Sequence, residues 1–183
     1  MIDNGSTDQT PAYVQACGVA RKETKCVFLP QNIGHGPALH MATEMATTPY
    51  LFTLDSDTEV QVPGFLELMV EASKDESVYA VGDLLYVRSK DCEMASRTPQ
   101  AWPEFTPYIH PYMGLYRLSM YKQIRPFMHH GGPAIFNMVD ARTRDWKCIN
   151  FPIQDYVSHL GGGTWQLYGH DWNVAPSRRP VGW

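Results

Sequence analysis

The stretch that decides the fold is Tyr50-Leu51-Phe52-Thr53-Leu54-Asp55-Ser56-Asp57-Thr58-Glu59-Val60. Its apolar run is typical of a short buried strand, and the polar residues after it predict a turn. Asp55 and Asp57 are separated by one residue, so in an extended segment their side chains point the same way. Two carboxylates that face one spot suit a divalent cation such as Mg²⁺ or Mn²⁺, whereas the alternative is an ordinary turn rich in Asp and Ser.

Length and composition predict one cytoplasmic domain over residues 1–183. The formal net charge of −4 gives no electrostatic reason to expect nucleic acid or an anionic membrane as a partner. No apolar run approaches the roughly 18 residues of a membrane span, and the start shows no signal-peptide pattern. The cysteines lie far apart without a Cys-X-X-Cys pair, so we expect free thiols rather than a zinc site or a disulfide framework.

Strand-like and helix-like segments alternate over the first half of the chain. We expect strands over residues 25–29, 50–54 and 78–87, and helices over residues 10–22, 38–46 and 65–73. This alternation predicts an α/β fold with a mostly parallel sheet and helices on both faces. Ligands bind at the carboxyl ends of strands in such sheets, where Asp3, the Gly-rich loop 31–37 and the Asp55/Asp57 turn would converge.

The second half is predicted with fewer regular elements. Residues 97–111 are rich in Pro and aromatic residues, which favours an irregular loop, and 116–124 suit either a strand or a helix. Within this region His110 and Tyr112 are the expected polar contributors to an acceptor site, although ordinary packing under a long loop is the alternative. Residues 134–144 predict a helix, and 153–157 a strand.

Three motifs follow one another along the chain: Asp3-Asn4-Gly5-Ser6-Thr7-Asp8, Asn32-Ile33-Gly34-His35-Gly36 and Leu54-Asp55-Ser56-Asp57. A late His159 before several glycines comes after them. Together, in this order, these features resemble the family 2 glycosyltransferases. The resemblance covers residues 1 to about 165 and implies the Rossmann-like GT-A fold and a nucleotide-activated sugar as donor. It assigns residues 1–88 to a nucleotide-sugar-binding half, 89–165 to an acceptor-side half and 166–183 to a tail or lid.

The resemblance implies a nucleotide site near the start of the chain. Asp3 would accept a hydrogen bond from a nucleobase ring N–H of a UDP- or GDP-sugar, and the alternative is a turn or capping Asp. Asn32 and Gly34 would lie in the loop that approaches the nucleotide, because Gly lets the backbone come close. The alternative for that loop is a plain left-handed turn.

It also implies a metal site for Mn²⁺ or Mg²⁺. Asp55 would lie near the ribose and the metal, Asp57 would coordinate the metal directly, and His159 would complete the site. Imidazole suits Mn²⁺ well, whereas the alternative for a lone His is an ordinary surface or core residue.

Members of the family transfer the sugar with inversion, which requires a general base for the acceptor hydroxyl. The acidic pair that usually supplies this base is absent from the sequence. His130, Asp155 and Asp140 are the candidates, together with His129, and a His has a suitable unperturbed pKa for the task.

Family members also carry a strand, a loop and a helix before the turn at Asp3, so the sequence resembles an N-terminally truncated copy. A missing strand would leave an unpaired sheet edge. We therefore expect marginal stability or self-association, and weakened nucleotide affinity.

The leading hypothesis is a metal-dependent inverting glycosyltransferase of the hexosyltransferase type. Its acceptor would be a glycan, a lipid-linked group or a protein, as in polysaccharide biosynthesis. The first alternative is a non-catalytic module of the same fold that binds sugar nucleotides or glycans. The second is a metal-dependent nucleotidyltransferase, although the Gly-rich loop with a basic residue that such enzymes carry after the first strand is absent.

Overall fold

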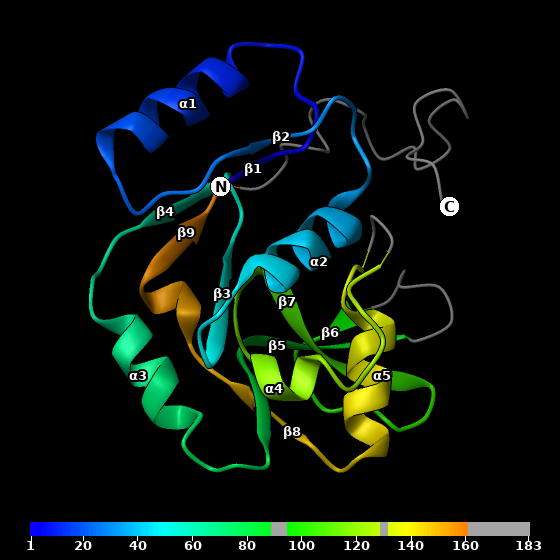
Figure 1. The fold of residues 1–183 in the computed structure, drawn as a ribbon. Helices are drawn as coiled ribbons and strands as arrows, with labels where there is room; N and C mark the ends of the chain where they lie inside the picture. The colour runs from blue at the N-terminus through cyan, green and yellow to red at the C-terminus, as the bar shows by residue number, and fades with distance from the viewer. Residues whose placement is uncertain (89–94, 129–131, 161–183) are drawn as a thin grey trace.

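The computed structural model describes residues 1–88, 95–128 and 132–160, which Figure 1 draws in colour. His129, His130, Cys92, the glycines after His159 and the expected tail at 166–183 lie outside this part of the chain. Among the described helices, none has the length and apolar character needed to cross a membrane. A cytoplasmic location stays a prediction.

A long antiparallel pair of strands forms the centre of the main sheet. β5 (Val78–Arg88) pairs with β7 (Phe105–Arg117), and β3 (Tyr50–Leu54) pairs with the other edge of β7. Two short strands, β6 (Ala95–Ser96) and β8 (Lys147–Asn150), pair with the remaining edge of β5. The strand order is therefore β3-β7-β5-β6, with β8 beside β5.

The strand directions correct one part of the prediction. β3, β5 and β8 run one way, whereas β7 is antiparallel to both β3 and β5. The sheet is therefore mixed rather than mostly parallel. The difference arises because β7 lies between β3 and β5 and runs opposite to both.

β7 also replaces residues 105–111 of the loop predicted over residues 97–111. The proline residues of this segment predicted a loop, because Pro has no N–H to donate to the hydrogen bonds of a sheet. Pro107 and Pro111 lie in the half of β7 that precedes Met113, where its pairing with β3 ends. Within the described chain, Pro107 is in a stretch that pairs with β5 alone and leaves its other edge unpaired, and Pro111 is in the unpaired bulge at residues 110–113. Proline is tolerated at both kinds of position.

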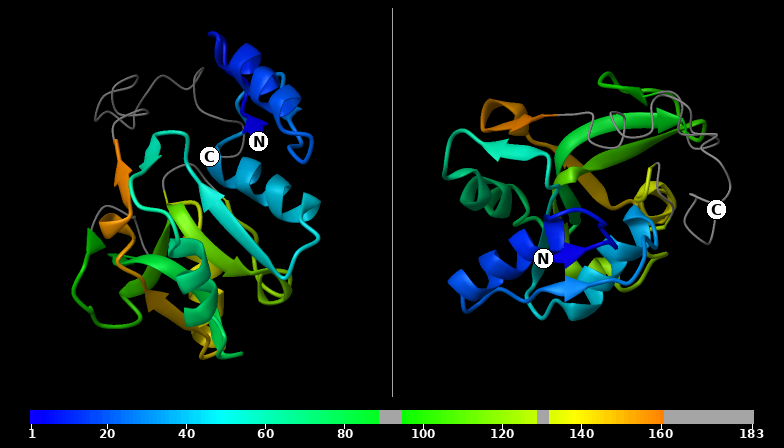
Figure 2. Two further views of the ribbon diagram at one scale, coloured as in Figure 1. Left: turned by 90° about the vertical axis from the view of Figure 1, so that its left-hand side faces the viewer. Right: turned by 90° about the horizontal axis from the view of Figure 1, so that it is seen from above.

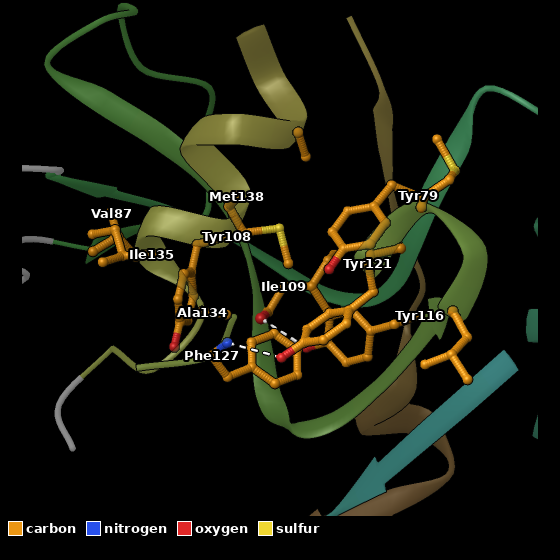
Figure 3. Close-up of a cluster of buried hydrophobic side chains, with 14 residues drawn as sticks. Tyr79, Val87, Tyr108, Ile109, Tyr116, Tyr121, Phe127, Ala134, Ile135 and Met138 are labelled. Carbon is orange, nitrogen blue, oxygen red and sulfur yellow. Dashed lines mark hydrogen bonds between the residues drawn. The ribbon is translucent and has the colours of Figure 1, made fainter. Parts of the chain in front are cut away.

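Helices cover both faces of the sheet, as the sequence predicts. On one face lie α2 (His35–Met45), α4 (Leu118–Tyr121) and α5 (Ile135–Thr143). Figure 3 shows the aromatic cluster between this layer and the sheet, in which the Tyr121 hydroxyl accepts a hydrogen bond from the Phe127 N–H at 2.9 Å. The Tyr116 hydroxyl donates to the Ile109 carbonyl at 3.4 Å, so both hydroxyl groups are satisfied within the apolar cluster.

On the opposite face, α3 (Phe65–Ala72) packs against the sheet through Phe65 and Met69. The short helix η1 (Ile153–Asp155) and the strand β9 (Val157–His159) complete this layer. The sequence prediction of one strand over residues 153–157 is therefore wrong. Ile153 and Val157 are both buried in this layer, but a turn of 3₁₀ helix separates them.

Two small strand pairs lie at the same end of the molecule (Figures 1 and 2). β1 (Ile2–Asp3) runs parallel to β2 (Val27–Phe28), and α1 (Thr10–Ala20) connects them. β4 (Thr58–Val60), which follows the turn after β3, pairs antiparallel with β9. The self-association expected from an unpaired edge stays a prediction.

Candidate functional site

Backbone hydrogen bonds from two directions hold the turn between β3 and β4. The Asp55 N–H donates to the carbonyl of Tyr112 in β7 at 2.9 Å, and the Leu160 N–H donates to the Asp57 carbonyl at 2.8 Å. Within the turn, the Thr58 hydroxyl donates to the Asp55 carbonyl at 2.6 Å. The backbone that carries both carboxylates is therefore fixed by the main sheet on one side and by β9 on the other.

The β4–β9 pair brings Asp57 and His159 together. The register places Thr58 opposite His159, and the Asp57 Oδ1 lies 3.3 Å from the His159 Nε2. Both side chains are about one third exposed, so a ligand can reach them. A carboxylate oxygen and an imidazole nitrogen form a donor pair that fits a divalent transition metal such as Mn²⁺.

Asp55 has a different partner. Its Oδ1 lies 3.3 Å from the Nε2 of His35, the first residue of α2. Sequence reasoning missed His35 as a site residue, although it lies inside the Gly-rich motif. In the part of the chain that the structure describes, no three His, Cys, Asp or Glu side chains form a metal-binding group.

Asp3 is buried at the end of β1 and only partly satisfied. Its Oδ2 accepts a hydrogen bond from the Ser6 N–H at 3.3 Å, whereas its Oδ1 is buried without a hydrogen-bond partner. An unsatisfied buried acceptor costs about 1–3 kcal/mol, so such atoms are uncommon away from functional sites. An N–H donor on a bound ligand would satisfy it.

Side-chain amides hold the turn after Asp3 against the Gly-rich loop. The Asn4 Oδ1 accepts from the Ile33 N–H at 3.0 Å, and its Nδ2 donates to the Asn32 Oδ1 at 3.1 Å and to the Gly34 carbonyl at 3.2 Å. The Asn32 Oδ1 also accepts from the Gly34 N–H at 2.8 Å. Asn32 and Gly34 thus lie beside the Asp3 turn, as predicted, and Gly34 has a positive φ of 97°.

The candidate bases lie in different surroundings. Asp140 is on α5, where both carboxylate oxygens accept hydrogen bonds from Arg125, and this pairing lowers the pKa of Asp140. A carboxylate stabilised in this way is a poor base, which favours a role in holding the loop before α5. Asp155 is exposed at the end of η1, two residues before β9. His130 lies outside the described residues.

The family is shown by the sequence match. Residues 1–142 match the model of glycosyl transferase family 2, so the chain belongs to this family. No curated protein matches the chain at a significant level.

Solved structures show the same GT-A fold. The mannosyltransferase PcManGT from Pyrobaculum calidifontis, in complex with GDP-Man and Mn²⁺, is 20% identical with a TM-score of 0.63, and the match covers 82% of this chain and 44% of that one. The glucosyl-3-phosphoglycerate synthase from Mycobacterium tuberculosis, in complex with phosphoglyceric acid, is 18% identical with a TM-score of 0.58 and coverages of 91% and 62%. The chain thus spans less than two thirds of either protein.

Gly5 offers a test of the Asp3 turn. Its φ is +76°, and a Cβ atom added there would lie 2.3 Å from the Gln31 carbonyl carbon. We therefore expect Gly5→Ala to push the Gly-rich loop away and to lower the melting temperature measured by calorimetry. Gly64→Ala is the matched control, because Gly64 also has a positive φ but has open space around its Cβ position. Equal losses for both variants would contradict a close contact at Gly5.

Asp140 offers a test by pH. Because its folded-state pKa is lowered, the Arg125 pair adds stability above the unfolded value of about 3.9, and this is lost as the pH falls toward the folded value. Asp140→Asn should cost on the order of 1 kcal/mol at pH 7, since Arg125 is partly exposed. In urea titrations, the difference in the free energy of unfolding between Asp140→Asn and wild type should become smaller below about pH 4. A gap that is independent of pH would contradict this role.

Proposed function

We propose that the chain is a metal-dependent inverting glycosyltransferase that moves a sugar from a nucleoside-diphosphate sugar to an acceptor hydroxyl. The observation that carries the proposal is the contact between Asp57 and His159, two residues far apart in sequence that β4 and β9 bring to 3.3 Å. Both side chains are accessible. The chain's membership of glycosyl transferase family 2 gives this pair its chemical context.

The donor would be held at two places. The unpartnered Oδ1 of Asp3 would accept the ring N–H of the base, which both uracil and guanine offer. Asp57 and His159 would hold the cation, and Asp55 would lie near the ribose and the diphosphate. Mg²⁺ and Mn²⁺ commonly combine one or two protein carboxylates with substrate phosphates, so a closed cage of protein ligands is not required.

A cation bound here would neutralise the negative charge that develops on the leaving diphosphate. The residues of the chain would position the donor sugar, and a base on its opposite face would take the proton of the acceptor hydroxyl. Direct attack from that face inverts the anomeric centre. Asp155 and His130 are the candidate bases, since Asp140 is committed to Arg125.

The solved relatives guide the choice of ligands. PcManGT was solved with GDP-Man and Mn²⁺, which supports GDP and Mn²⁺ as early probes beside UDP. The acceptor class, whether glycan, lipid-linked or protein, stays open to screening. The non-catalytic alternative predicts nucleotide binding without turnover, and the nucleotidyltransferase alternative predicts release of pyrophosphate.

Calorimetric titration of UDP and GDP tests the donor site. We expect one nucleotide to bind in the presence of Mn²⁺, with at least about tenfold weaker binding after chelation or in Asp57→Ala, because Asp57 would help to hold the cation that neutralises the diphosphate. Asp3→Ala should weaken binding with and without metal. The control is Glu71→Ala, on the exposed face of α3, which should bind as wild type does. Binding that neither chelator nor Asp57→Ala changes would contradict the proposed metal site.

Asp155→Asn tests the base. With the donor sugar nucleotide selected by titration and water as acceptor, we expect the turnover rate to fall by a factor of about 100 or more, with unchanged nucleotide affinity. Asp140→Asn is the matched control and should keep its turnover rate. Full activity of Asp155→Asn would exclude Asp155 and leave His130 as the candidate.

A further inference from the structure

An irregularity in the central strand pair brings β7 side chains to the site. Gly82 pairs with Gly114 and Leu84 with Ile109, so Asp83 alone in β5 stands opposite residues 110–113 of β7. Such bulges bend a strand and change the direction of its side chains, and they are common beside active sites. A Cβ at Gly82 would lie 2.9 Å from the Met113 carbonyl oxygen, so the close approach of the two strands here requires glycine.

Tyr112 lies within this bulge and contacts both halves of the candidate metal site. Its carbonyl oxygen accepts the Asp55 N–H at 2.9 Å. Its ring stacks on the imidazole of His159, with 4.5 Å between the ring centroids and 17° between the ring planes. The ring of His110 packs edge-on against the Tyr112 ring, and the His110 Nδ1 accepts a hydrogen bond from the Tyr112 N–H.

An ion pair between a buried carboxylate and an exposed guanidinium lies near the Tyr112 side chain. Asp83 is buried and makes a two-point contact with the guanidinium of Arg97, in which Nη2 donates to Oδ2 at 3.1 Å. With the Gln154 side-chain amide oriented so that its oxygen faces Arg97, this oxygen accepts a hydrogen bond from the Arg97 Nη1 at 2.9 Å. Burial, together with the nearby Asp83 carboxylate, raises the pKa of Tyr112 to about 12.

We propose that Tyr112 is a positioning residue for the metal site, which holds the His159 imidazole beside Asp57. The inference rests on the proposed function and deepens it. Tyr112 itself does not coordinate the cation. It acts by fixing the ring of one ligand and the backbone of Asp55.

The need for such a residue follows from the position of His159. It is on a three-residue strand and about one third exposed, and among its ring contacts the stacking on Tyr112 is closer than the tilted contact with His110. Ordering a side chain costs up to about 1–2 kcal/mol, and a ring already held in place avoids that cost when the metal binds. Residues that orient metal ligands typically change metal affinity by a factor of 10–100.

The alternative is that Tyr112 simply fills the apolar layer between α3 and the sheet. Two substitutions separate these roles. Tyr112→Phe keeps the ring that stacks on His159 and removes the hydroxyl, whereas Tyr112→Leu removes the ring and keeps an apolar side chain. Tyr50→Leu is the matched control, because Tyr50 packs against the same layer but does not contact the site.

The test is a Mn²⁺ titration of the metal-free full chain, in which binding is measured by calorimetry or electron paramagnetic resonance. We expect Tyr112→Leu to weaken Mn²⁺ binding at least about tenfold, and Tyr112→Phe and Tyr50→Leu to stay within about twofold of wild type. Nucleotide binding in chelator should be the same for Tyr112→Leu and wild type. Wild-type Mn²⁺ affinity in a folded Tyr112→Leu chain would overturn the inference, whereas a wild-type chain that binds no Mn²⁺ would overturn the proposed function with it.

A second measurement needs no variant of Tyr112. In the metal-free wild-type chain, the stacked tyrosine ring should shift the His159 ring-proton resonances upfield, with the assignment made by their loss in His159→Gln. Resonances of His159 at ordinary positions would show that the rings are not stacked and would overturn the inference, even if Tyr112→Leu failed to fold.

Discussion

The hydrogen bond from the Asp55 N–H to the Tyr112 carbonyl joins the candidate site to the centre of the sheet. It continues the β3–β7 ladder by one step, beyond the last pair of Leu54 with Met113. The turn that carries Asp55 and Asp57 therefore starts from a rigid strand end. Because β7 is also paired with β5, the position of the two carboxylates depends on the best-packed part of the molecule.

The site combines this rigid part with a peripheral one. Asp55 is fixed by the main sheet, whereas the Asp57 carbonyl is held by the N–H of Leu160, just after β9. His159 comes from β9 itself, a short strand held by β4 and by the ring of Tyr112. Asp3 comes from a third element, the β1–β2 pair, whose turn is held by the amide contacts of Asn4. Three separate backbone segments thus supply the groups that would contact the base, the ribose and the diphosphate.

Local sequence patterns were sufficient for the first half of the fold. The strand over residues 50–54 was predicted with its exact bounds, and four of the expected helices form within a few residues of their predicted ends. β7 could not be predicted in the same way, because proline is tolerated inside a sheet only at a bulge or where one edge of a strand lacks a partner. That depends on which strands are neighbours, a property of the assembled sheet rather than of residues 105–117 themselves.

The site was predicted in its residue types better than in its pairings. Asp57 and His159 come together as expected, but the contact of Asp55 with His35 depends on where α2 begins in space. The bulge opposite Asp83 likewise has no local signal except Gly82 and Gly114. A Cβ at Gly82 would meet the neighbouring strand β7, and a Cβ at Gly114 would meet the Tyr116 ring of its own strand. Sequence reasoning assigned His110 and Tyr112 to the acceptor site, which stays a prediction, and it did not foresee the contacts of their rings with His159.

The central claim is that Asp57 and His159 together hold the cation that binds a nucleoside diphosphate. The most direct measurement is a crystal structure of the chain with Mn²⁺ and the nucleotide that binds, with the metal located by its anomalous scattering. The account predicts one strong anomalous peak bonded to the Asp57 carboxylate, the His159 imidazole and the diphosphate. A bound nucleotide whose metal lies away from His159, or whose base lies away from Asp3, would contradict it.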